Sequence, residues 1–415
     1  QDVAQDAHPS VTAVFTTMAA NDPYSAVALD RAFGLEYELA VPAMLGERER
    51  DQTLEEDPRG VQQAETREKV AERLNRVPPG CIYIPYGHQV MPQWKVVFDR
   101  TAQVPNMTGF ELVSPILAGV DGHQKLVAML EALNLLNPDV SKACGHHVHI
   151  NAKDLAVDPP NWRPPERPPE RPRFMGIPAP QQNPPPPPPP TAAQLTKIKK
   201  VCVAYIMYEK AFDLMTSKSR QAELNEFCQS NQAQMVRIHG SLQLAVEAIK
   251  GAGSLQALVD LVNPEVGRGP RYMKLNLTNL TQGRHRTAPS PSFTIEFRQH
   301  QAAHTPEKSD NWVELIQRFF HNAITREDYV NPPEVLQEQP TLLWLHMMFK
   351  MINRLQLTRY FWGRINELDD LRWRRPVRAP TEFRRNVAEH GLDWLKQQLY
   401  QLVPRENPQN APGPA

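Results

Sequence analysis

Apolar and polar residues alternate in several segments of the chain, which is the pattern of a half-buried strand. In the stretch FGLEYELAVP, which begins at residue 33, Leu35, Tyr37 and Leu39 share one face. Glu36 and Glu38 share the opposite face. Side chains two residues apart on a strand are about 7 Å apart. These two carboxylates therefore repel each other unless water or a cation screens them.

Five further segments repeat this alternation. They are WKVVFD (94–99), FELVSP (110–115), GHHVHIN (145–151), RYMKLNL (271–277) and FTIEFRQH (293–300). Their polar faces carry Lys95, Asp99, Glu111, His147, His149, Tyr272, Lys274, Asn276, Glu296, Arg298 and His300. A merely hydrated strand face usually mixes Thr, Ser, Lys and Glu, whereas Glu and His bind cations and Arg binds phosphate. We expect an antiparallel sheet with one metal-binding face.

Helical spacing fills much of the remaining chain. Residues 195–216 have the periodicity of an amphipathic helix. Ser309 is expected to cap a helix with Trp312 and Phe319 on its apolar face. Beyond Thr341 the pattern is almost entirely helical. Strands and helices together predict the α+β class, with a helical C-terminal part.

The order of these patterns divides the chain into four parts. We expect an N-terminal extension (1–30), a central domain (31–330), a C-terminal helical region (331–406) and a disordered tail (407–415). A polar insertion at 46–76, expected to be a solvated helix or a mobile excursion, interrupts the central domain. A proline-rich insertion at 151–191 ends in seven consecutive prolines. So many prolines exclude a helix or a central strand there and favour a spacer.

Composition narrows the range of partners. The 415 residues are 41% hydrophobic, which allows a large core, and the formal net charge is zero. We therefore expect no recruitment of nucleic acid or of an acidic membrane. The four cysteines lie far apart without a C-x-x-C pair, which argues against a disulfide framework or a structural zinc site. No apolar run of about 18 residues and no signal-peptide pattern is present, so we expect a cytoplasmic protein.

The donor set indicates which metal the polar face binds. Carboxylates outnumber imidazoles, and such a set suits Mg²⁺ or Mn²⁺ better than zinc. Protein-bound Mg²⁺ usually works with substrate phosphates. The segment 266–300 is basic, with Arg268, Arg271, Lys274, Arg284, Arg286 and Arg298. No P-loop or Rossmann motif is present, so phosphates are expected at the metal and at these cations.

The order FGLEYEL, ELVSPIL, CGHHVHI, KLNL and TIEFRQH resembles the amidoligase family, which belongs to the glutamine-synthetase-like carboxylate–amine ligases. The resemblance extends over about residues 32–324 and is interrupted by the proline-rich insertion. It implies a curved antiparallel sheet of the glutamine-synthetase catalytic type, flanked by helices. That sheet would hold ATP and two or three Mg²⁺ (or Mn²⁺) ions on its concave face.

The resemblance also implies roles for individual residues. The metal ligands would be Glu36, Glu38, Glu111, His147 and Glu296. The catalytic residues would be Glu296, Arg298, which would hold the transferred phosphate, and Arg220. The nucleotide-binding residues would be His149, Arg271, Lys274 and Asn276, with Asp99 assisting the substrate. The chain departs from the family pattern at His146 and at Gln301-Ala302-Ala303, where the family tends to have Glu-Gly-Thr.

The implied activity is an ATP- and Mg²⁺-dependent ligase that forms an amide through an acyl phosphate. Its partners would be small-molecule or peptide carboxylates and amines. Two alternatives stay open. In one, His146, His147 and His149, with His300 or His304, bind zinc in a hydrolase. In the other, the protein is an inactive binding scaffold.

Overall fold

The computed structural model describes residues 29–43, 58–85, 87, 89–102, 104–159, 162, 187–221, 225–281, 292–326, 341–352 and 354–368. The strands are β1 (Phe33–Pro42), β2 (Cys81–Ile84), β3 (Trp94–Val97), β4 (Met107–Val113), β5 (Gly145–Asn151), β6 (Leu275–Asn276) and β7 (Thr294–Gln301). The helices are α3 (Pro58–Leu74), α4 (Gly119–Asn134), α5 (Lys153–Ala156), α6 (Ala192–Leu214), α7 (Lys218–Gln221), α8 (Asn231–His239), α9 (Leu242–Gly251), α10 (Leu255–Val262), α11 (Pro306–Thr325), α12 (Thr341–Ile352) and α13 (Leu355–Leu368). Two short 3₁₀ turns, η1 (Pro270–Tyr272) and η2 (Thr278–Leu280), flank β6.

The strands form one seven-stranded sheet in the order β2-β3-β4-β1-β5-β7-β6. Among these strands of the described residues, β2 and β3 pair in parallel, and the other neighbouring pairs are antiparallel. The α+β class and the largely antiparallel sheet are therefore confirmed, while the likeness to glutamine synthetase stays a prediction. Strand β2 was not expected, and the segment 271–277 forms only the short β6 after η1.

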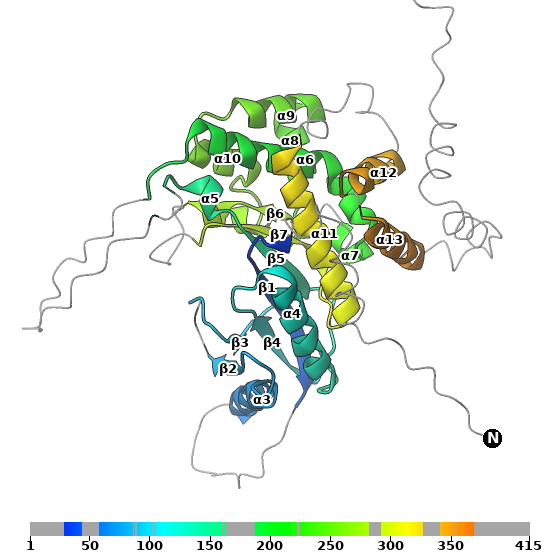
Figure 1. Cartoon of the computed structure of the whole chain (residues 1–415). Coiled ribbons are helices and arrows are strands. Elements are labelled where there is room, and N and C mark those ends of the chain that lie inside the picture. The colour runs from blue at the N-terminus through cyan, green and yellow to red at the C-terminus, as the bar shows by residue number, and fades with distance from the viewer. Residues whose placement is uncertain are drawn as a thin grey trace, which may run out of the picture.

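Helices α4 and α11 lie side by side across one face of the sheet (Figure 1), with α6 packed against α11. The alternation of β1 places Leu35, Tyr37 and Leu39 on this face, where all three are buried. Phe297 of β7 lies 6.4 Å from Phe319 of α11, measured between ring centroids. Burial of these apolar side chains is the main driving force that holds helices to sheet.

Helix α3 is less solvated than expected for part of a polar insertion. It packs on β2, β3 and β4 and buries Val70, Ala71 and Leu74. Arg67 donates from Nε to the carbonyl oxygen of Gly109 at 2.8 Å and lies over the ring of Phe98. The helix offered for this insertion is therefore present at 58–74, but it is solvated on one side only, because its other side is apolar. The first part of that insertion lies outside the described residues.

The predicted helix at 195–216 is confirmed as α6, with Thr191 and Gln194 forming a capping box at its start. The cap predicted at Ser309 is wrong. Helix α11 begins at Pro306 after Thr305, because proline is favoured in the first helical turn. Ser309 instead lies inside the helix, fully buried, with Oγ 2.5 Å from the hydroxyl of Tyr37.

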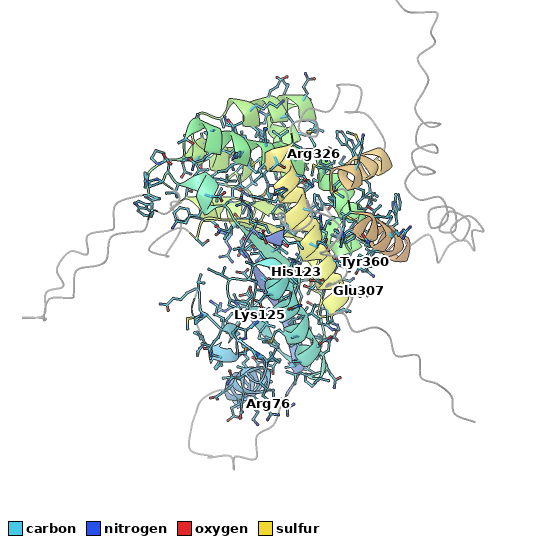
Figure 2. The ribbon with its side chains drawn as sticks, viewed as in Figure 1. Arg76, His123, Lys125, Glu307, Arg326 and Tyr360 are labelled. Atoms are coloured by element: carbon cyan, nitrogen blue, oxygen red, sulfur yellow. The ribbon has the colours of Figure 1, made fainter. Side chains whose placement is uncertain are left out.

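A buried polar pair joins α4 to α11. His123 lies where these helices meet (Figure 2), with Nδ1 2.6 Å from Oδ1 of Asp310. Its Nε2 lies 2.8 Å from Oε1 of Gln317. Burial alone would lower the pKa of His123, but the bond to Asp310 and its charge raise it above the ordinary value. This pair holds α11 against α4.

The remaining predicted regions are described only in part. Asn151 and α5 belong to the packed fold, so the proline-rich insertion begins later than residue 151, and 163–186 lie outside the described residues. The helical C-terminal region is present as α12 and α13, while 1–28 and 369–415, which include the predicted tail, are not described. Within the described chain, no helix combines the length and the apolar character that a membrane crossing requires.

Candidate active site

The register of the strands brings the predicted polar residues together. Glu38 lies opposite Glu111 in the β1–β4 ladder, and Glu36 lies opposite His147 in the β1–β5 ladder. In the β5–β7 ladder, His149 lies opposite Glu296. Directly opposed residues in antiparallel strands point to the same side of the sheet. The carboxylate face is thus formed by Glu36, Glu38, Glu111, His147, His149 and Glu296.

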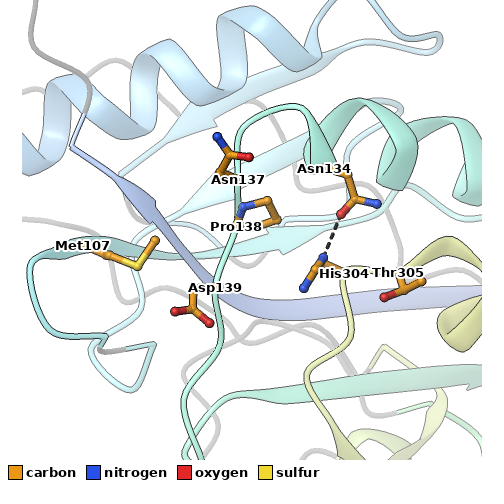
Figure 3. A pocket seen from close by; sticks show the side chains of 7 residues that line it. All are labelled: Met107, Asn134, Asn137, Pro138, Asp139, His304 and Thr305. Carbon is orange, nitrogen blue, oxygen red and sulfur yellow. Dashed lines mark hydrogen bonds between the residues drawn. The ribbon is translucent and has the colours of Figure 1, made fainter.

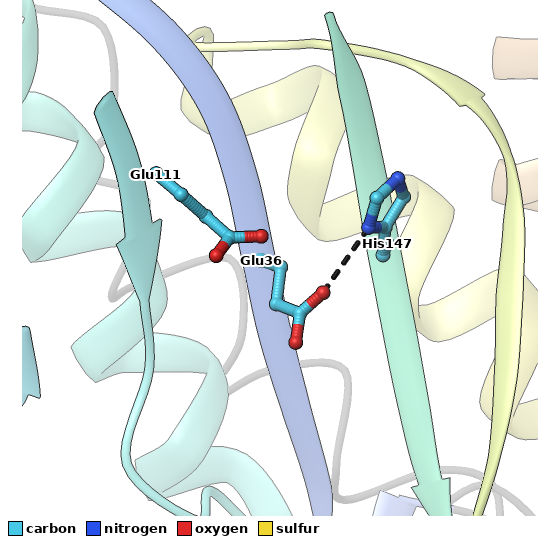
Figure 4. Close-up of side chains that lie close together, drawn as sticks. All are labelled: Glu36, Glu111 and His147. Atoms are coloured by element: carbon cyan, nitrogen blue, oxygen red, sulfur yellow. Dashed lines mark hydrogen bonds and ion pairs between the residues drawn. The ribbon is translucent and has the colours of Figure 1, made fainter. Parts of the chain in front are cut away.

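Glu36 is the central acid of the carboxylate face. Its Oε2 lies 3.2 Å from Nδ1 of His147 (Figure 4), and its Oε1 lies 3.3 Å from Nε2 of His149. Burial alone would raise the pKa of Glu36, but the two imidazoles hold it well below its usual range. In turn, Glu36 and Glu296 outweigh the burial of His149 and raise the pKa of its imidazole to about 9.

Glu296 joins the carboxylate face to two further polar side chains. Its Oε1 accepts a short hydrogen bond from Arg298, and its Oε2 accepts one from Nδ2 of Asn276 at 2.7 Å. Burial opposes ionisation, yet Arg298 and His149 together lower the pKa of Glu296. Asn276, predicted to bind the nucleotide, therefore lies beside the carboxylate of Glu296.

Glu111 is the acid of the carboxylate face whose pKa is raised. Burial and the charges of Glu36, Asp99 and Glu38 raise the pKa of Glu111 well above its ordinary value. Three overlapping groups have ligand atoms within 4.8 Å of one another: Glu36, Glu111 and His147; Glu36, His149 and Glu296; and Glu38, Asp99 and Glu111. These oxygen-rich sets fit Mg²⁺ or Mn²⁺, which would compensate the excess negative charge.

Two buried arginines flank the carboxylate face. Arg220 of α7 is 1% exposed and donates from Nη2 to the carbonyl oxygen of Ala143 at 3.2 Å. A Cβ on Gly145 would lie 2.6 Å from both Arg220 Nη2 and His147 Nε2, so these two side chains converge across the glycine. The Nε atoms of Arg220 and Arg298 are buried and have no hydrogen-bond partner among the described residues. Such donors fit a phosphate or carboxylate oxygen.

The histidines divide between the two faces of the sheet. Three residue steps of β7, from Phe297 to His300, span two steps of β5. This bulge turns His300 to the helix-covered face, where it lies 4.6 Å from the ring of Trp312. The prediction that His300 shares a face with Glu296 and Arg298 is therefore wrong.

His146 also lies on the helix-covered face. It stacks on Tyr37 at 4.4 Å, and its Nε2 lies 3.4 Å from Oγ of Ser309. His304 is farther away again, with Nδ1 bound to Asn134 at 2.7 Å. The zinc alternative requires His146 to converge with His147 and His149. His146 lies on the opposite face of the sheet and does not converge with them.

His304 belongs instead to a separate pocket at one end of the sheet (Figure 3). The pocket is lined by Met107, Asn134, Asn137, Pro138, Asp139, His304 and Thr305. Of these residues, the sequence analysis had singled out only His304. The other lining residues belong to no sequence motif. They come together only in the fold, where the α4–β5 connection meets the start of α11.

Two of the predicted nucleotide-binding cations have other surroundings. Lys274 is fully buried, and its Nζ lies 2.7 Å from Oδ1 of Asp213 and 3.4 Å from Oε1 of Glu209, both on α6. Lys274 is therefore paired with acids of α6 and not with those of the carboxylate face. Arg271 is exposed beside the ring of Tyr272. Arg284 and Arg286 lie outside the described residues.

Lys95 is a cation of this face to which the sequence had assigned no role. In the β3–β4 ladder it lies opposite Val113, two residues beyond Glu111 on the same face. It is 5% exposed, and its Nζ donates to the carbonyl oxygens of Gly87 and Gln89 at 3.1 and 2.8 Å. Burial lowers the pKa of Lys95. The alternation of WKVVFD predicted that Lys95 lies on the polar face. The fold adds that this face of β3 lies beside Glu111.

Clustered carboxylates and imidazoles lie beside buried guanidinium groups, a donor set that suits a cation together with an anion. Comparison with known proteins finds a family match over part of the chain. Residues 29–163 match the family model described as "Putative amidoligase enzyme". This match confirms the amidoligase prediction and supports enzyme status. The matched segment holds Glu36, Glu38, Glu111, His147 and His149, whereas Arg220, Glu296 and Arg298 lie beyond it. A search of the curated proteins gives no match.

Proposed function

We propose that the protein is an ATP- and Mg²⁺-dependent carboxylate–amine ligase. The observation that carries the proposal is a set of three overlapping ligand groups, in each of which the ligand atoms lie within 4.8 Å of one another. Two of these groups include Glu111, which has an unfavourable excess of neighbouring negative charge. A family of amidoligases supplies the reaction type. The sheet face supplies the donor set that such a reaction needs.

The ligands proposed for the cations are Glu36, Glu38, Glu111, His147 and Glu296, with Asp99 at the edge of the set. When bound, Mg²⁺ or Mn²⁺ would neutralise negative charge on the phosphates of ATP. His149 and Asn276 hold Glu36 and Glu296 in place through the contacts described above. Glu36 and Glu296 are therefore oriented before any cation arrives, which reduces the cost of assembling the site.

The two arginines act on the reacting groups. A carboxylate is a poor electrophile, so its oxygen first attacks the γ-phosphorus of ATP, and ADP leaves. The amine nitrogen then attacks the acyl carbon, phosphate leaves, and the nitrogen loses a proton. Arg298, oriented by Glu296, would neutralise charge on the transferred phosphoryl group, and Arg220 would approach it from across Gly145. The protein's work is mainly positioning and charge neutralisation.

Trapping of the acyl phosphate tests this proposal. The protein is incubated with ATP, Mg²⁺ and a panel of carboxylic acids, with hydroxylamine in place of the amine. The proposal predicts an acid-dependent release of ADP matched by an equal amount of hydroxamate. The variant Glu296→Gln should lose both products. Release of ADP that is independent of every acid, or hydroxamate without ATP, would contradict a ligase mechanism.

A further inference from the structure

A strip of aromatic and cationic side chains borders the carboxylate face at Arg298. The ring of Tyr272 lies 5.8 Å from the guanidinium carbon of Arg298 and 4.9 Å from that of Arg271. One aromatic ring therefore contacts both the buried arginine of the site and an exposed arginine at its edge. Arg271, Tyr272 and the neighbouring Gln229 are called the arginine rim.

Backbone contacts hold the arginine rim in shape. The N–H of Gln229 donates to the carbonyl of Tyr272 at 2.7 Å, and the N–H of Lys274 donates to the carbonyl of Gln229 at 2.8 Å. Gly267 turns with a φ of 56° and approaches the amide of Gln229 so closely that a Cβ would clash with it. The Nε2 of Gln229, a residue 8% exposed, is buried and finds no hydrogen-bond partner in the part of the chain that the structure describes. A buried amide donor left unpaired in this way costs free energy unless a ligand accepts from it.

The charge of the arginine rim resides on Arg271, which is exposed. Among the described residues, Arg271 has no carboxylate within ion-pair distance. Its neighbour Arg268 differs, because its Nε donates to Oε2 of Glu226 at 2.7 Å while it stacks on Phe227. Arg271 and Gln229 therefore offer donors without acceptors, and an anion is the ligand that satisfies them.

The position of the arginine rim decides which anion this is. Arg298 stands where the phosphoryl group is transferred, so a ring in contact with it borders the acid substrate. The adenine of ATP would lie at the opposite end of the triphosphate. Because both guanidinium groups contact one ring, their separation cannot exceed the sum of the two distances above. A compact substrate with two anionic groups can span the distance between the two guanidinium groups.

We propose that the acid substrate is a dicarboxylate, whose first carboxylate is activated at Arg298 and whose second is bound by Arg271 and Gln229. This inference rests on the proposed ligase function and names its substrate class. It also moves Arg271 from the nucleotide, where the sequence analysis had placed it, to the acid. Tyr272 forms the wall between the two carboxylates.

Calorimetry tests the proposal with the full chain, Mg²⁺ and the non-hydrolysable ATP analogue AMP-PNP. The probes are malonate, succinate, glutarate and adipate, each compared with the monocarboxylate of equal length. The wild type is expected to bind at least one diacid about tenfold more tightly than its monoacid. Arg271→Gln should abolish this preference, and Arg271→Lys should restore part of it. Arg268→Gln, the matched control at an arginine already paired with Glu226, should keep it.

Three results would overturn the inference. One is a wild type without any preference for a diacid, and another is an Arg271→Gln variant that keeps the preference. The third is an Arg271→Gln variant that loses affinity for AMP-PNP while its acid preference is unchanged, since this returns Arg271 to the nucleotide. The ligase function itself is judged separately, by binding of AMP-PNP with Mg²⁺ to the wild type. Its absence would remove both proposals.

Discussion

Glu38 and Glu111 face each other directly across the β1–β4 ladder, so two acids of neighbouring strands share one side of the sheet. Like charges in this position destabilise a strand pair. Burial and the charges of Glu36, Asp99 and Glu38 raise the pKa of Glu111 well above its ordinary value. The arrangement lowers the free energy of unfolding of the metal-free protein, and a bound cation would raise it again.

Glu111→Gln is therefore expected to stabilise the metal-free protein by about 1 kcal/mol, because it removes the repulsion and keeps the shape. Urea unfolding in the presence of a chelator measures this. Added Mg²⁺ should raise the stability of the wild type more than that of the variant. Glu72→Gln on the exposed side of α3 is the control and should change neither quantity. A less stable Glu111→Gln protein with an undiminished response to Mg²⁺ would refute this reasoning.

Gly145 offers a test of the convergence of Arg220 and His147. In Gly145→Ala the new Cβ would lie 2.6 Å from the ends of both side chains, so at least one must move. We expect affinity for ATP with Mg²⁺ to fall about tenfold or more, with the fold retained. Gly34→Ala is the matched control on the same face, because its Cβ would make only ordinary contacts, 3.8 Å from His149 and 3.9 Å from Ser114. Equal behaviour of the two variants would contradict the prediction.

The buried pair of His123 and Asp310 predicts a dependence of stability on pH. The folded-state pKa of His123 is raised by Asp310 above its value in the unfolded chain. Stabilisation by the pair is thus complete below the unfolded pKa of about 6.5 and is lost as pH rises through the folded value. His123→Gln should cost about 3 kcal/mol near the acid end of this window and less at alkaline pH. Urea unfolding at both pH values measures this, and a cost that grows with pH would contradict the sign.

Local alternation was sufficient to predict most of the carboxylate face. Glu36 and Glu38, like His147 and His149, are two residues apart, and a strand places such pairs on one side whatever its neighbours are. Once β1 and β5 are neighbours in the sheet, the two glutamates and the two histidines lie close together. Glu296 was found in the same way, and its contact with Asn276 followed from the neighbouring strand.

Two of the wrong predictions concern contacts between distant segments, which the sequence of one segment does not reveal. His300 is turned by a bulge that exists only in the pairing of β7 with β5. Lys274 is drawn to Asp213 and Glu209 on α6, a helix about 60 residues earlier in the chain. The start of α11 is different, because Pro306 after Thr305 was a readable signal that the choice of Ser309 overlooked.

The most direct test of the central claim is calorimetric titration of ATP into the wild type and Glu296→Gln, with and without Mg²⁺. The account predicts binding to the wild type that requires Mg²⁺ and is lost in the variant, because Glu296 both belongs to a ligand group and orients Arg298. Circular dichroism of the variant should show the wild-type fold. Binding that is equal in both proteins, or no binding to the wild type with Mg²⁺ or Mn²⁺, would contradict the claim.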